Sequence, residues 1–190
     1  FLNVKYILLS NDNDLNLKPL YNSSALGPAW FVSEVKIIND ADQLLEGLKG
    51  VDFNKTALIL KKNLPPKMSK IYNKNQSAKI ELVESKPDQL IYKVSTDNRG
   101  FAVFSEMFYP KGWIAEIDGK ESEILNVNYV LRALEIPAYA SKVEFRFEPE
   151  VVVRGTILRL ANFLIFITVV FVLGYFEYFK TKARSNGNHS

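Results

Sequence analysis

The chain offers few side chains that could carry acid–base, nucleophilic or metal chemistry. Its 190 residues include no cysteine and a single histidine, His189, next to the last residue. These counts exclude thiolate nucleophiles, cysteine-bound zinc, Ser-His-Asp catalysis and metal sites built from several histidines. The sequence therefore predicts no catalytic residue, no metal site and no cofactor for this chain.

The carboxylates do not suggest a catalytic pair either. Strand alternation places Glu144, Arg146 and Glu148 on one face of the same strand, as is typical of a solvated, charged strand face. A glycosidase would need two carboxylates at a fixed separation and in different environments. We therefore expect these residues to serve solubility and strand pairing.

One acidic triplet, Asp12-Asn13-Asp14, matches the D-x-D pattern with which some glycosyltransferases hold a divalent metal ion through sugar phosphates. A calcium-binding EF-hand loop would need glycine in place of Leu17 and glutamate in place of Ser23. Asn and Asp are also common turn formers, because their side chains bond to the local backbone. A turn is the favoured interpretation.

Aromatic rings near polar side chains are the remaining candidates for a site. Carbohydrates bind through flat aromatic faces with hydrogen-bonding groups close by. The glycan-binding residues predicted on this basis are Tyr109, Trp113, Asn128, Tyr129 and Arg132.

Two of these residues have a structural explanation as well. Trp113 follows Gly112 at the start of an expected strand, where it could be a core residue of a β-sandwich. Arg132 lies between two apolar residues in mid-strand, and a buried arginine would need a partner. The candidate partners are Glu106, Glu116 and Asp118.

Short strands separated by turns must position these side chains. From residue 77 onward, about seven apolar or alternating segments follow at close spacing, and Asp118-Gly119 is a strong signal for a two-residue hairpin turn. One of these segments, residues 122–127, is expected to be a single strand. We predict a mainly β fold, with an antiparallel β-sandwich over residues 77–150.

The preceding residues predict two further segments. Residues 1–60 are expected to form a small α/β lead-in, with strands at 4–9, 29–38 and 56–60. Asp40 is a plausible N-cap of a helix that presents Leu44, Leu45 and Leu48 and stops at Gly50. Residues 61–76 contain paired prolines and several polar residues, and are predicted to be a connector.

An apolar run of 17 residues without charge occupies residues 160–176. As a helix it would span about 26 Å, and residues 156–158 extend it toward the bilayer core of about 30 Å. We predict a transmembrane helix over residues 155–179. The basic residues that follow predict a cytoplasmic tail over residues 180–190, with the body outside the cytoplasm. The alternative is a buried helix or strand of a soluble core.

Beyond these patterns, residues 105–149 resemble the C-terminal extracytoplasmic domain of the bacterial YfhO-like integral membrane proteins. The shared motifs are Tyr109-Pro110-Lys111-Gly112-Trp113, Ile117-Asp118-Gly119-Lys120, Asn128 with Arg132-Ala133, Ile136-Pro137-Ala138, and the run from Val143 to Pro149. Two N-terminal stretches, residues 2–7 and 26–32, fit as well, and so does a terminal membrane helix. The chain departs from the family at Tyr139-Ala140-Ser141, where a Gly-x-His turn is expected.

The resemblance implies a polytopic membrane protein similar to lipid-linked-sugar glycosyltransferases, with a role in glycosylating a cell-envelope polymer. Its catalytic carboxylate would lie in an early loop outside this chain. This part would bind or position glycan, or brace the catalytic core; the alternative is a non-catalytic, membrane-tethered structural or binding module. The implied partners are the lipid bilayer, the upstream membrane helices and an envelope glycan or lipid-linked sugar. A net charge of +3 is too small to indicate nucleic acid.

Overall fold

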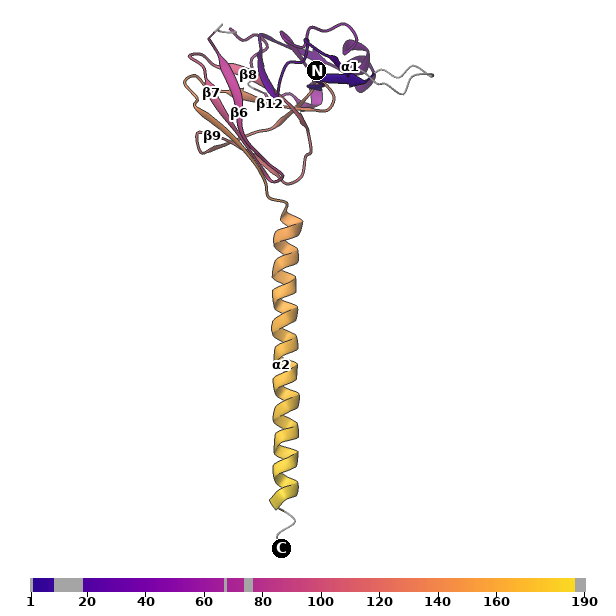
Figure 1. The fold of residues 1–190 in the computed structure, drawn as a ribbon, viewed down its shortest axis with the longest axis vertical. Coiled ribbons are helices and arrows are strands. Elements are labelled where there is room, and N and C mark those ends of the chain that lie inside the picture. Colours follow the sequence, from indigo (N-terminus) through magenta and orange to yellow (C-terminus); the bar gives the residue numbers. More distant parts are fainter. Residues whose placement is uncertain (1, 9–18, 67, 74–76, 187–190) are drawn as a thin grey trace. The chain divides into compact units, whose positions relative to one another are not determined.

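A computed structural model of the chain describes residues 2–8, 19–66, 68–73 and 77–186. The chain divides into two units, Phe1–Phe147 and Glu148–Ser190. The first unit is built mainly from strands, and the second contains one long helix (Figure 1). The triplet at residues 12–14 and His189 lie outside the described residues.

A five-stranded antiparallel sheet has the strand order β10-β9-β13-β7-β6. In that order its strands are Lys120–Ser122, Trp113–Ile117, Lys142–Phe147, Gln89–Ser95 and Lys79–Lys86. Side chains of a strand alternate between the two faces of its sheet. In β7, Leu90, Tyr92 and Val94 are buried and the residues between them are not. This sheet thus has one buried face and one solvated face.

A six-stranded sheet has the strand order β3-β8-β12-β11-β5-β4. In that order its strands are Ala29–Val32, Gly100–Met107, Leu131–Ile136, Leu125–Val127, Thr56–Leu60 and Glu34–Ile38. Its pairs are antiparallel except β4 and β5, which are parallel. Four consecutive residues of β8, from Phe101 to Phe104, are fully buried. Both faces of this sheet are therefore covered.

The main core lies between the two sheets. Phe104 comes from the six-stranded sheet, and Tyr92 and Phe145 come from the five-stranded sheet. The Phe104 ring meets each of the other two edge-to-face, with ring centroids 4.9 Å apart. Aromatic pairs favour this geometry because the positive ring edge faces the negative ring face. The prediction of a mainly β, sandwich-like fold is confirmed.

Three described strands of the predicted lead-in, residues 1–60, belong to the six-stranded sheet: β3, β4 and β5. The helix of this segment, α1, Ala41–Gly47, joins the parallel strands β4 and β5, and Asp40 caps it by accepting a hydrogen bond from the backbone N–H of Gln43 at 2.8 Å. The helix ends at Gly47, before the predicted Gly50. The expected strand 29–38 is divided into β3 and β4, and both lie in the six-stranded sheet. The sheet thus joins the two regions that composition had separated.

The described part of the predicted connector, residues 61–66 and 68–73, packs against the outer face of the six-stranded sheet. Tyr72 is buried there and donates a hydrogen bond to the Glu135 carboxylate at 2.8 Å. Leu64 and Met68 are half-buried against the same apolar cluster. The paired prolines gave the segment the composition of a linker, but its three apolar side chains cover the sheet.

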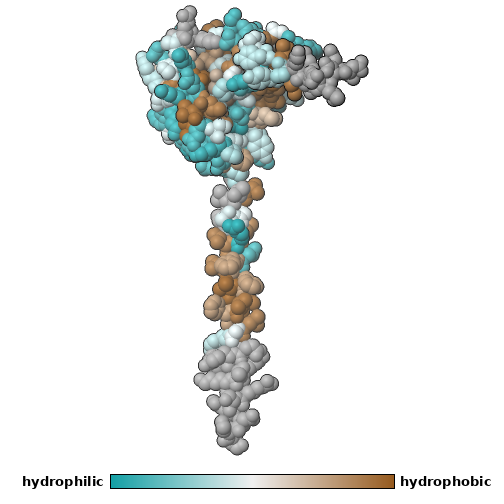
Figure 2. All heavy atoms as spheres, in the orientation of Figure 1, coloured by the Kyte–Doolittle hydropathy of each residue, from teal (hydrophilic) through white to brown (hydrophobic). Residues whose placement is uncertain are grey.

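The second unit contains helix α2, Glu150–Asn186. Its window Leu158–Tyr175 has a mean hydropathy of 2.0, and none of it is buried within the protein. Figure 2 shows apolar residues along this stretch. Among the described residues, this one helix is long and apolar enough to cross a membrane.

The remaining two-stranded sheet pairs β1, Tyr6–Leu8, with β2, Pro19–Tyr21.

Candidate functional site

Two chain connections that run between the sheets flank a cleft at one side of the sandwich. Residues 108–112 lead from β8 to β9, and residues 123–124 lead from β10 to β11. The cleft encloses about 220 Å³. Its lining, called the aromatic cleft below, consists of Phe108, Tyr109, Pro110, Trp113, Ile114, Ala115, Glu121, Ser122, Glu123 and Ile124.

The predicted single strand over residues 122–127 is wrong, and this error bears directly on the cleft. Its two ends belong to different sheets, because β10 ends at Ser122 and β11 begins at Leu125. The segment reads Ser-Glu-Ile-Leu-Asn-Val, with no glycine or proline to mark the point where the chain leaves one sheet and enters the other. The crossing places Glu123 and Ile124 in the wall of the cleft.

Trp113 serves both the core and the cleft. Its ring is partly buried and packs 5.2 Å from the ring of Phe147, centroid to centroid. The guanidinium of Arg132 lies over the ring at 4.1 Å from its centroid. Trp113 also lines the aromatic cleft. Its packing agrees with the core interpretation, while its place in the cleft lining keeps the stacking interpretation as a prediction.

Tyr109 presents its ring to solvent beside this group. It is 55% exposed, and its ring centroid lies 6.5 Å from that of Phe147. The loop that carries it is shaped by Pro110, with its fixed φ, and by Gly112, whose φ of 95° favours glycine. An exposed tyrosine in a wall of a cleft is a suitable contact for a ligand with a flat apolar face.

Arg132 is buried behind Trp113, at 4% exposure, and is outside the cleft lining. Its Nε–H donates to the backbone oxygen of Met107 at 2.8 Å, and its Nη1 is buried with no hydrogen-bond partner among the described residues. Desolvation lowers its pKa, and the charge of Glu106 opposes that shift. Glu106 is thus an electrostatic neighbour of Arg132.

The other two candidate partners of Arg132 are engaged elsewhere, so those two predictions are wrong. The carboxylate of Glu116 accepts hydrogen bonds from Arg146, one of them at 3.0 Å. The carboxylate of Asp118 accepts from Ser141 Oγ at 2.6 Å and from the backbone N–H of Lys142 at 2.9 Å. Glu116 lies on the outer face of β9, and Asp118 lies in the turn that follows this strand. Neither carboxylate is near Arg132, which faces the core.

Asn128 has a backbone role. It is completely buried, and its Oδ1 accepts from the N–H of Leu58 at 2.8 Å while its own N–H donates to the oxygen of Leu58 at 2.8 Å. The amide therefore continues the pairing of β11 with β5. Tyr129 follows in the turn before β12, with φ of 72° and 47% exposure. Neither residue lines the aromatic cleft.

Of the five predicted glycan-binding residues, the structure thus brings Tyr109 and Trp113 into one cleft. Sequence reasoning missed the cleft residues Glu121, Ser122 and Glu123. A signal for Ser122 was present, because the Asp118-Gly119 turn fixes the register of the hairpin. That register places Glu121 opposite Glu116 and Ser122 opposite Ala115. Counting back from the turn would have placed Ser122, opposite Ala115, on the same face of the hairpin as Trp113, and Glu121 on the other face with Glu116.

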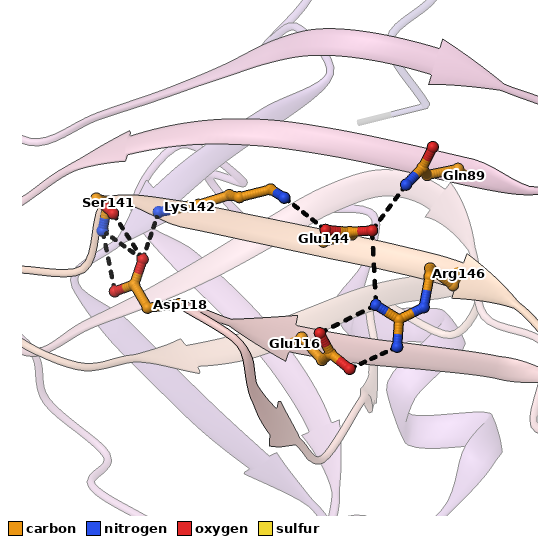
Figure 3. A network of polar contacts seen from close by, with 7 residues as sticks. All are labelled: Gln89, Glu116, Asp118, Ser141, Lys142, Glu144 and Arg146. Carbon is orange, nitrogen blue, oxygen red and sulfur yellow. Dashed lines mark hydrogen bonds and ion pairs between the residues drawn. The ribbon is translucent and has the colours of Figure 1, made fainter.

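The outer face of the five-stranded sheet carries a separate polar network (Figure 3). Glu144 accepts hydrogen bonds from Lys142 and from Gln89, and Arg146 pairs with both Glu144 and Glu116. The hydrogen bond from Arg146 lowers the pKa of Glu116, and the hydrogen bonds from Lys142 and Gln89 lower the pKa of Glu144. A carboxyl group with a lowered pKa is a poor general acid at neutral pH.

Within the part of the chain that the structure describes, no group of three or more His, Cys, Asp or Glu side chains is arranged to hold a metal ion. The arrangement that remains is a cleft lined by Tyr109 and Trp113 and by the polar residues Glu121, Ser122 and Glu123. This chemistry suits binding.

Comparisons with protein-family models, with curated proteins and with solved structures give no match to this chain. The resemblance to the YfhO-like membrane proteins therefore stays a prediction.

Proposed function

We propose that this chain is a membrane-anchored, non-catalytic module whose β-sandwich binds glycan in the aromatic cleft. One observation supports this most directly: Trp113 and the exposed Tyr109 line the same cleft, together with the polar residues Glu121, Ser122 and Glu123. Sugar rings combine an apolar C–H face with peripheral hydroxyl groups, so they need both kinds of wall.

Helix α2 supports the anchoring part of the proposal. Its apolar window of 18 residues would extend about 27 Å, close to the thickness of a bilayer core. With α2 as a membrane anchor, we propose that the sandwich faces the outside of the cell and that the tail faces the cytoplasm. In the setting that the sequence resemblance implies, the module would hold a sugar-bearing substrate of a membrane protein that glycosylates a cell-envelope polymer.

A second candidate function is a structural scaffold that binds no ligand. The contacts of Trp113 with Arg132 and Phe147 favour it, because they would explain the tryptophan by packing alone. The two candidates differ in what they expect of Tyr109, whose ring is largely exposed and contributes little to a core.

The test is Tyr109→Ala in the full chain, held in micelles of a zwitterionic detergent without a sugar headgroup. Binding of neutral mono- and disaccharides is measured by isothermal titration calorimetry. We expect a millimolar Kd for the wild type and an affinity about threefold to tenfold weaker for the variant, as the loss of one aromatic contact implies.

Tyr139→Ala is the matched control. Tyr139 is 81% exposed and lies outside the aromatic cleft, so the same truncation there should leave binding unchanged. Equal losses at both positions, or no binding of any neutral sugar by the wild type at millimolar concentration, would refute the proposal in favour of the scaffold.

A further inference from the structure

We infer that Arg132 is a positioning residue of the aromatic cleft, because its guanidinium fixes the indole of Trp113 in the orientation that binds glycan. This inference rests on the proposed function and names a residue that sets the affinity without touching the ligand. Arg132 lies outside the cleft lining, so it acts only through the tryptophan.

Trp113 is placed beside the cleft by the geometry of its strand. It is the first residue of β9, and strand alternation puts its side chain on the same face as Ala115 and Ile117, which are buried between the sheets. The hairpin register puts Ser122, opposite Ala115, on this face as well. Trp113 and Ser122 therefore lie on the inner face of the five-stranded sheet, and both line the cleft.

The Arg132 side chain reaches the Trp113 ring from the opposite sheet. Arg132 pairs with Phe104 in the register of β12 with β8, so both side chains point into the core. The guanidinium carbon lies over the Trp113 ring at 4.1 Å from its centroid, and 5.5 Å from the centroid of Phe145. A planar guanidinium stacks on an aromatic face, and the contact is stronger when water is excluded. Turning the indole about its side-chain bonds would break this contact.

The guanidinium is itself fixed by an irregularity of β8. The register of β8 with β12 shifts next to Arg132, where β8 contains extra residues that include Glu106. The backbone oxygen of Met107 accepts the Nε–H of Arg132 at 2.8 Å, and the charge of Glu106 acts on the guanidinium. Bulges of this kind redirect groups beside functional sites. Arg132 thus has fixed partners on one side and the Trp113 ring on the other.

Two substitutions separate the stacked guanidinium from the charge and the volume of the side chain. Arg132→Met keeps most of the volume and removes the charge. Arg132→Lys keeps the charge, but a compact ammonium group cannot stack flat on the ring. Arg99→Met is the matched control, because Arg99 precedes β8 at the end opposite to Met107, is exposed and pairs with Glu135.

Fluorine NMR of 5-fluorotryptophan measures both the order of the ring and sugar binding. The full chain is held in micelles of a zwitterionic detergent without a sugar headgroup. Trp113 reports the cleft, and Trp30 reports the fold, because its indole is buried and donates to the backbone oxygen of Phe53 at 2.7 Å. A Trp30→Phe variant assigns the two signals. The probes are methyl glucoside and N-acetylglucosamine.

In the wild type we expect a single Trp113 signal that sugar shifts in a saturable way. In both Arg132 variants the Trp113 signal should broaden or split without ligand, while the Trp30 signal stays as in the wild type. The affinity for sugar should fall about threefold to tenfold, since the contact of one aromatic ring is partly lost. Arg99→Met should change neither the signals nor the affinity.

The outcomes that contradict the inference are distinguishable from failure of the proposed function. Arg132 variants that bind sugar as tightly as the wild type, or that keep a single sharp Trp113 signal, would overturn the inference while glycan binding stands. A Trp30 signal that changes together with that of Trp113 would also overturn it, because Arg132 would then act on the whole sandwich. A wild-type Trp113 signal that neither sugar shifts would refute the proposed function and the inference together.

Discussion

Replacing Arg132 by methionine should leave the β-sandwich about as stable as the wild type, whereas replacing it by alanine should destabilise it strongly. The guanidinium is buried, stacks on Trp113 at 4.1 Å and lies 5.5 Å from the ring centroid of Phe145. It makes one hydrogen bond, to the Met107 backbone, and its Nη1 has no partner among the described residues.

The favourable and unfavourable contributions of the charge nearly cancel. Desolvated cation–π contact stabilises by about 2 kcal/mol, and a hydrogen bond from a charged donor by about 1.5–3 kcal/mol. Against these stand a desolvation cost of several kcal/mol and about 1–3 kcal/mol for the unpartnered N–H. Methionine keeps most of the side-chain volume without the charge, so we expect a change in the free energy of unfolding within about 1 kcal/mol. Alanine leaves a cavity, which costs about 2–5 kcal/mol.

Urea unfolding followed by tryptophan fluorescence measures the difference, because both tryptophans belong to the first unit and helix α2 contains none. With a slope of about 2 kcal/mol per molar urea, a loss of 3 kcal/mol moves the midpoint by about 1.5 M. Arg99→Met is the matched control. The Arg99 guanidinium is exposed and pairs with Glu135 at 3.0 Å, so its removal should lower the free energy of unfolding by less than about 1 kcal/mol.

A methionine variant that unfolds at the same low urea concentration as the alanine variant would refute this reasoning. The charge itself would then stabilise the fold, and Glu106, which interacts electrostatically with Arg132, would be its partner. In that case Glu106→Gln should lower the unfolding midpoint by a similar amount.

Three further expectations concern the hairpin turn, the helix and a strained turn residue. Hydrogen bonds from Ser141 lower the pKa of Asp118, so its carboxylate stabilises the fold above its unfolded pKa of about 3.9 and loses this effect as the pH falls through the lower folded value. Asp118→Asn should therefore lower the free energy of unfolding by less than about 1 kcal/mol at pH 7. Urea titrations should show that the difference between the variant and the wild type vanishes at acidic pH. A difference that stays the same at every pH would contradict this origin. Phe166→Lys, inside the apolar window of α2, should make membrane insertion about 3 kcal/mol less favourable in a glycosylation-reporter insertion assay, and unchanged insertion would argue against a membrane-spanning α2. Tyr129 has φ of 72°, so Tyr129→Val should lower the free energy of unfolding by about 1–2 kcal/mol while Tyr129→Gly should not; equal effects in urea titrations would exclude backbone strain as the cause.

Features governed by neighbours in the chain could be predicted from the sequence. The Asp118-Gly119 turn has φ of 49° and 78°, as its residue types predict, and it pairs Lys120 with Ile117. Asp40 caps the helix that it was expected to cap, and Leu44 faces the core at 1% exposure. In each case the interacting residues are only a few positions apart in the chain, so the local sequence is enough to predict the structure.

Features governed by distant strands could not be predicted in the same way. The pairing of β3 with β8 depends on Phe31 facing Ala102. The burial of Asn128 depends on Leu58 of β5, which lies in the segment that composition assigned to a separate lead-in. A polar residue with a positive φ in a turn is usually exposed, so no local signal distinguished Asn128 from Tyr129.

The sequence by itself determined the mainly β composition, the hairpin turn, the helix cap and the one apolar helix of the described chain, because periodicity and turn chemistry are local. The tertiary structure decided that β10 and β11 enter different sheets, that Arg132 lies behind Trp113, and that Tyr109, Trp113 and Glu121 share a cleft. The physical reason is that strand pairing and sheet packing join residues far apart in the chain, and apolar alternation has the same pattern whichever sheet a strand joins.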